Sequence, residues 1–182
     1  MSFFRKIFLF LALFFLFSLI LAAGVKGKEQ VATPAPEEIN SFELFWPIVA
    51  GKTEGDSLYQ LKLFKENLRE FLIPSSIKKA DYNIVLSEKR LVEAEKLLMS
   101  SRIDLAKKTL EKATFRRQKA LSLYEKAKNS GAGISDLSAH FITSFEKQRS
   151  LLLYLSSKTQ EEGKPLVISS LENLNFILSQ LQ

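Results

Sequence analysis

Apolar residues recur at spacings of three and four along most of the chain beyond residue 56, which is the spacing of one face of an α-helix. The pattern is interrupted by Pro74, by residues 99–102, by the segment 129–133 and again at Gly163 and Pro165. Between these breaks it predicts five helices, over about residues 57–73, 75–98, 103–128, 135–157 and 165–181. Short connections make consecutive helices antiparallel, so the predicted fold is all-α, an antiparallel bundle of about five helices.

The first predicted helix has a clear apolar stripe and recognisable ends. Ser57 and Gln60 have the spacing of a capping box, and Pro74 stops the helix. The stripe consists of Leu61, Phe64, Leu68 and Phe71. We therefore count this helix among those of the bundle.

The second and third predicted helices form a coiled-coil-like hairpin. In the second, the spacing alternates strictly between three and four, which defines a heptad seam. Its members are Ile77, Ala80, Ile84, Ser87, Leu91, Ala94 and Leu98. In the third, alanines fall seven residues apart, at Ala106, Ala113, Ala120 and Ala127. Small residues at every second seam position allow a neighbouring helix to approach closely.

Arg117 is the exception in the seam of the third helix, between Leu110 and Tyr124. A half-buried guanidinium favours a carboxylate with good geometry. From the register of the hairpin we expect a structural ion pair with Glu88 or Asp81. The alternative is that the long side chain of Arg117 extends to solvent.

A second stripe on the third helix is basic and lies opposite the alanines. It consists of Lys108, Lys112, Arg116, Lys119 and Lys126. The simplest interpretation is a solvated face. The sharper hypothesis is an electrostatic surface for an anionic envelope polymer or for lipid headgroups.

The chain begins with a membrane-targeting pattern. Arg5 and Lys6 precede the uncharged, apolar segment 7–25, which as a helix would span about 28 Å and so nearly match a bilayer core. Residues 1–25 are therefore a cleaved signal peptide or a retained single-pass membrane anchor, and the length of the apolar run favours the anchor. In both cases the body lies outside the cytoplasm, at the cell membrane or, after cleavage, as a secreted or periplasmic protein.

The next segment, residues 26–55, is a linker followed by an apolar arm. Pro34 and Pro36 indicate an extended linker. The arm, around Trp46, either packs on the helical body or lies at the membrane interface, where Trp is favoured. Residues 56–182 then form the bundle domain.

The composition excludes several chemistries. There is no Cys and His140 is the only His, so neither a thiol nucleophile nor a zinc site is expected. No phosphate-binding loop and no nucleophile elbow occurs in the sequence. A net charge of +6 is too mild for a nucleic-acid binder. We expect no catalytic, cofactor or metal site, and hence a protein that is not an enzyme.

Motifs over about residues 55–128 resemble a known family. They are S-L-Y-x-L-K at 57–62, K-K-A at 78–80 and R-L-x-E-A-E at 90–95. The stretch resembles an uncharacterised bacterial and archaeal domain family of secreted or membrane-anchored proteins, and the resemblance implies an extracytoplasmic helical domain without assigning an activity. Together these features predict a non-enzymatic envelope protein that acts through contacts with another envelope protein. The alternative function is binding of an anionic polymer or lipid surface through the basic stripe.

Overall fold

The seam residues of the predicted hairpin lie in the middle of a helical bundle in the computed structural model, which describes residues 39–181. All regular structure in these residues is helical, in agreement with the predicted fold class. The elements are α2 (Ser41–Leu44), α3 (Tyr59–Leu72), α4 (Ser76–Met99), α5 (Ile103–Asn129), α6 (Ser135–Lys158) and α7 (Lys164–Ser179).

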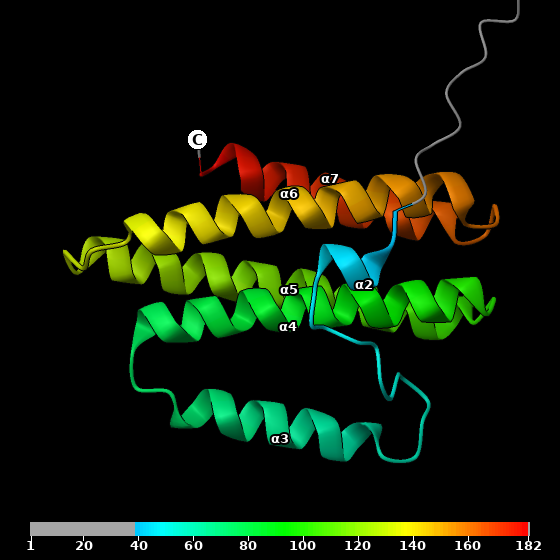
Figure 1. The fold of residues 1–182 in the computed structure, drawn as a ribbon, viewed down its shortest axis with the longest axis horizontal. Coiled ribbons are helices and arrows are strands. Elements are labelled where there is room, and N and C mark those ends of the chain that lie inside the picture. Colours follow the sequence, from blue (N-terminus) through cyan, green and yellow to red (C-terminus); the bar gives the residue numbers. More distant parts are fainter. Residues whose placement is uncertain (1–38, 182) are drawn as a thin grey trace, which may run out of the picture. The chain divides into compact units, whose positions relative to one another are not determined.

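The long hairpin of α4 and α5 follows the predicted pattern closely. The side chain of Ser75 accepts a hydrogen bond from the backbone N–H of Lys78 and so caps α4 at the expected residue. Apart from Ile77, which is half-buried, every member of the predicted α4 seam is buried, and so are the four alanines of α5. Because alanine is small, α5 can pack closely along α4 in the antiparallel hairpin that Figure 1 shows.

Two further helices complete the bundle. Figure 1 shows α6 and α7 along one side of the α4–α5 hairpin, where α6 packs on α4 and α7 packs on α5. Aromatic rings fill the centre, with the ring centroids of Tyr124 and Phe141 at 5.2 Å and those of Phe141 and Phe145 at 5.3 Å. Pro165 occupies the first turn of α7, as expected for a residue with no N–H to donate.

The helix α3 differs from the prediction in its N-cap and in the side that faces the bundle. Figure 1 shows α3 along the opposite side of the hairpin from α6 and α7. Its N-cap is Leu58, which makes no side-chain capping bond, so the predicted capping box at Ser57 is wrong. Its apolar stripe is also exposed rather than buried.

The arm before α3 packs on the bundle mainly through Phe45, with Leu44 and Ile48 partly buried beside the core. Phe45, which follows the short helix α2, is 3% exposed and belongs to the hydrophobic core. The neighbouring Trp46 is 69% exposed and lies edge-on to Phe42, with 4.8 Å between the ring centroids. The packing interpretation of the arm is thus supported for Phe45, whereas Trp46 faces solvent.

The predicted membrane segment 7–25 and most of the linker lie outside the described residues. Within residues 39–181, no helix combines the length and apolar character needed to cross a bilayer. The proposed division of the chain at residues 25 and 55 therefore stays a prediction.

Candidate functional site

The polar face of α3, rather than its apolar face, is turned toward the bundle. The buried residues of this helix are Tyr59, Glu66 and Glu70, which share one side because they are seven and four positions apart. All three carry a polar or ionisable group. Such a face can be buried only if each group finds a partner on the bundle.

The first set of partners surrounds Arg90 of α4, which is 1% exposed. Its Nη1 lies 2.5 and 2.6 Å from the two carboxylate oxygens of Glu93, and its Nη2 pairs with Glu66. Glu93 also accepts a hydrogen bond from the hydroxyl of Tyr59 at 3.0 Å and one from Nζ of Lys62 at 2.5 Å. Burial disfavours the guanidinium cation, but the charges of Glu93 and Glu66 outweigh it and raise the pKa of Arg90.

The second set of partners surrounds Glu70. Its carboxylate oxygens lie 2.6 Å from Nη1 of Arg116 and 2.6 Å from Nζ of Lys119, and one accepts a hydrogen bond from Asn83 at 2.8 Å. Arg116 also donates to the side chain of Asn67 at 2.6 Å. Burial works against the charge of Glu70, but the bonds from Lys119, Asn83 and Arg116 prevail and hold the pKa below its usual value. These two clusters, which we call the ionic mount of α3, hold the helix on the bundle.

The opposite side of α3 is apolar and exposed to solvent. We define the apolar face of α3 as Leu58, Leu61, Phe64, Leu68, Phe71 and Leu72, all of them exposed. Phe64 is 62% exposed and Phe71 is 79% exposed. A group of exposed apolar side chains of this kind is typical of an interaction site.

The charges of α3 are segregated in the same way. Its only carboxylates, Glu66 and Glu70, face the bundle and are paired there. Lys65 and Arg69 are exposed along one edge of the apolar face. The solvent side of α3 therefore carries apolar groups and positive charge without any acidic side chain.

The predicted basic stripe on α5 is largely used inside the molecule. Arg116 and Lys119 pair with Glu70, and Lys112 pairs with Glu54 of the arm. Three of the five residues of the stripe therefore have carboxylate partners from α3 and the arm, so the stripe as a whole is not a row of free cations, and anion binding by it stays a prediction. Lys108 and Lys126 remain exposed at either end of the stripe.

Arg117 is buried, but its predicted partners are elsewhere. Its Nη2 donates to the hydroxyls of Thr114 at 2.9 Å and Ser170 at 2.8 Å, and its Nη1 donates to the side-chain oxygen of Gln148 at 3.3 Å. All of these partners are neutral. The guanidinium points toward α6 and α7 instead of along α4, which is the physical reason that the predicted ion pair does not form.

The two carboxylates predicted for Arg117 have other partners. Glu88 accepts a hydrogen bond from the hydroxyl of Ser144 at 2.7 Å. Asp81 lies 2.6 Å from Nδ1 of His140, which is half-buried on α6. Within residues 39–181, no group of three or more His, Cys, Asp or Glu side chains is arranged to hold a metal ion.

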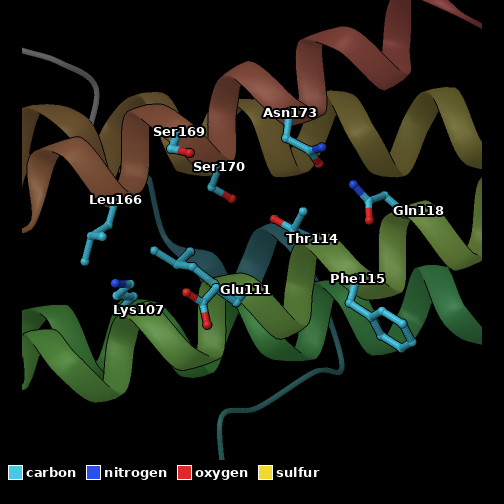
Figure 2. A pocket seen from close by; sticks show the side chains of 10 residues that line it. Lys107, Glu111, Thr114, Phe115, Gln118, Leu166, Ser169, Ser170 and Asn173 are labelled. Atoms are coloured by element: carbon cyan, nitrogen blue, oxygen red, sulfur yellow. The ribbon is translucent and has the colours of Figure 1, made fainter.

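A cleft of about 400 Å³ opens between α5 and α7, beside Arg117. Figure 2 shows Thr114 of α5 and Ser170 of α7 turned toward each other in this cleft. No sequence pattern predicted this cleft, because its walls come from two helices whose facing residues are more than fifty positions apart in the chain. The lining residues are Lys107, Leu110, Glu111, Thr114, Phe115, Gln118, Leu166, Ser169, Ser170 and Asn173.

Comparison with known proteins places the chain in one family. The family model described as a domain of unknown function (DUF5667) matches residues 51–164, which is more than half of the chain. The match includes the whole region of the expected resemblance, residues 55–128, and continues through α6. Neither the curated proteins nor the solved structures contain a match to this chain.

Proposed function

Since the chain belongs to the DUF5667 family, whose function is unknown, we propose a role from its own surface. The protein is a non-enzymatic envelope protein, membrane-anchored or secreted, whose helical body docks on an anionic lipid surface through the apolar face of α3. The observation that carries this proposal is the orientation of α3. The helix turns both of its carboxylates into the ionic mount and presents its leucines and phenylalanines to solvent.

The energetics favour an occupant for this face. Full burial of one Leu or Phe side chain contributes about 1.5–3 kcal/mol relative to an exposed one. In a helix that served only to cover the hairpin, the apolar side would be turned inward and this contribution would stabilise the fold. In α3 the inward side is instead held by ion pairs. The free energy of burying the leucines and phenylalanines can therefore contribute to the binding of a partner.

A lipid surface matches the face better than a second protein surface does. An interfacial helix has one apolar side and basic residues beside it, and it lies in the plane of the headgroups. Lys65 and Arg69 provide those basic residues, and each basic side chain near an anionic leaflet adds about 1 kcal/mol. The predicted membrane segment 7–25 supports the same proposal, because a linker of thirteen residues, 26–38, extends at most about 45 Å.

The test uses the absence of native cysteine, which allows one introduced thiol to carry an environment-sensitive fluorophore. Leu72→Cys places the label on the apolar face, and Ser157→Cys places it on an exposed site of α6 as the matched control. The full chain is reconstituted in nanodiscs of phosphatidylcholine alone or with about 30% phosphatidylglycerol.

In the anionic nanodiscs, we expect the fluorescence emission of the label at position 72 to shift to the blue and to be protected from quenching by iodide. The label at position 157 should show neither effect. Lys65→Glu together with Arg69→Glu should abolish the difference between the two lipids. Equal exposure of the label at 72 in both lipids would overturn the proposal. A blue shift that depends on protein concentration and not on lipid would show instead that a second copy covers the face.

A further inference from the structure

Arg117 is a buried cation without a counter-ion. It is fully buried, and within the described part of the chain no carboxylate oxygen lies within 4 Å of its nitrogen atoms. Among residues 39–181, its Nε has no hydrogen-bond partner. Burial lowers the pKa of Arg117 to about 10, so the side chain is still positively charged at neutral pH.

The charge is connected to the cleft between α5 and α7 by two hydroxyl groups. Thr114 and Ser170 both accept hydrogen bonds from Nη2 of Arg117, and both line the cleft. A hydroxyl that accepts from a cation still has its own proton to donate, and the positive charge strengthens that donation. The two hydroxyls, which Figure 2 shows facing each other, thus form a pair of polarised donors.

The rest of the cleft combines apolar and polar walls. Leu110 and Leu166 supply apolar surface beside the two hydroxyls. The side-chain oxygen of Asn173 is a buried acceptor in the same wall, without a hydrogen-bond partner in the described part of the chain. The volume of about 400 Å³ is within the range of small-molecule sites.

We propose that this cleft binds a small organic monoanion, a carboxylate with a short apolar tail. The carboxylate oxygens accept hydrogen bonds from Thr114 and Ser170, with the charge of Arg117 directly behind, and the tail lies against Leu110 and Leu166. Lys107 and Glu111, one basic and one acidic, also line the cleft, so the buried charge of Arg117 leaves one net positive charge beside it, which fits a ligand with one negative charge. Bound in this way, the ligand supplies the counter-ion that Arg117 lacks.

Hexanoate is the probe, and hexanamide is its neutral control of nearly equal shape. Binding to the full chain in zwitterionic nanodiscs is measured by saturation-transfer NMR, with empty nanodiscs subtracted. We expect hexanoate to bind and hexanamide to bind at least about tenfold more weakly, since a hydrogen bond to a charged group is the stronger one.

The variants assign the binding to the cleft. Ser170→Ala removes one donor but keeps Arg117, and it should weaken hexanoate binding about tenfold. Arg117→Met should abolish it. Thr109→Val is the matched control, because this hydroxyl is also buried and hydrogen-bonded but lies on α5 outside the cleft.

Circular dichroism verifies the helical content of each variant. The proposal is overturned if hexanoate fails to bind, if hexanamide binds equally well, or if Ser170→Ala binds hexanoate as tightly as the unmodified chain. The Ser170→Ala result remains decisive even if Arg117→Met does not fold.

Discussion

Two buried arginines, Arg90 and Arg117, have very different electrostatic surroundings. Both are almost completely inaccessible to solvent. Arg90 lies between the carboxylates of Glu66 and Glu93, whereas Arg117 bonds only neutral groups. Loss of one partner from a buried ion pair leaves the other charge unpaired, which costs about 3–5 kcal/mol, while an apolar side chain in place of an unpaired cation leaves no charge behind.

This contrast gives a prediction. Arg90→Met should lower the free energy of unfolding by about 3–5 kcal/mol, because Glu66 and Glu93 lose their common partner. Arg117→Met should lower it less, by about 1–3 kcal/mol, because no carboxylate loses a partner and the main loss is the hydrogen bond to the buried oxygen of Gln148. Urea unfolding of both variants, followed by circular dichroism, measures the two values. Equal losses for both would show that neutral hydrogen bonds stabilise Arg117 as fully as carboxylates stabilise Arg90.

At the scale of the element, α3 is held differently from every other long helix of the described region. The helices α4 to α7 bury apolar residues against one another, whereas α3 is held by its ionic mount. The mount depends on ionised carboxylates. Because the pKa of Glu70 is lowered from 4.5 in the folded chain, its contribution is complete above pH 4.5 and is lost as the pH falls further.

We therefore expect acid to release α3 before it unfolds the bundle. Hydrogen exchange is measured by mass spectrometry and corrected for the intrinsic effect of pH on the exchange rate. Exchange in residues 59–72 should accelerate as the pH drops below about 4.5, while α4 and α5 stay protected. Burial raises the pKa of Glu88 in the bundle, so acid does not weaken α4 through that residue. Glu70→Gln should exchange rapidly in α3 already at neutral pH. A simultaneous loss of protection in α3 and α4 would show that α3 does not detach separately from the unfolding of the bundle.

The same difference explains what the sequence could predict. The α4–α5 hairpin was predictable because most of its seam positions are apolar at a strict helical spacing, and α6 and α7 follow the same rule. For α3, the stripe at Leu61 and Phe64 correctly predicted an amphipathic helix but not the side that faces the bundle. That choice depends on pairs such as Glu66 with Arg90 and Glu70 with Arg116, which are separated by 24 and 46 residues.

The candidate sites were less predictable for a related reason. The basic stripe of α5 was visible in the sequence, but so were the carboxylates that neutralise it, and only the fold brings Lys112 next to Glu54. For Arg117, the place in the seam predicted a half-buried side chain, with extension to solvent as the alternative, whereas the side chain is fully buried. The direction of its guanidinium depends on where α7 lies, and no local pattern encodes that position.

At the scale of the whole molecule, two features bear on membrane attachment, and they can be separated. One is the predicted segment 7–25, which lies outside the described residues, and the other is the apolar face of α3. If the leader is retained, the chain stays in the membrane whatever happens to α3. If the leader is cleaved, the proposed docking of α3 is the remaining attachment.

Fractionation of cells that express the full chain resolves these cases when it is combined with a variant of the apolar face. Leu61, Phe64 and Phe71 are replaced together by Gln, which should change stability by less than about 1 kcal/mol because all three side chains are exposed. An intact mass of the product shows whether about 23–27 residues have been removed, as expected for a signal peptide. Protease added to unbroken cells or spheroplasts shows whether the body is outside.

We expect the full mass in the membrane fraction, with the body digested from outside, for both the unmodified chain and the triple variant. The variant should then differ only in faster digestion near residues 59–72, because its α3 no longer lies against lipid. If the leader is instead cleaved, the unmodified body should stay with the membrane at low salt and the triple variant should appear in the soluble fraction. Identical digestion and identical fractionation of the two chains would show that the apolar face of α3 has no part in membrane attachment, so that its occupant must be sought among envelope proteins.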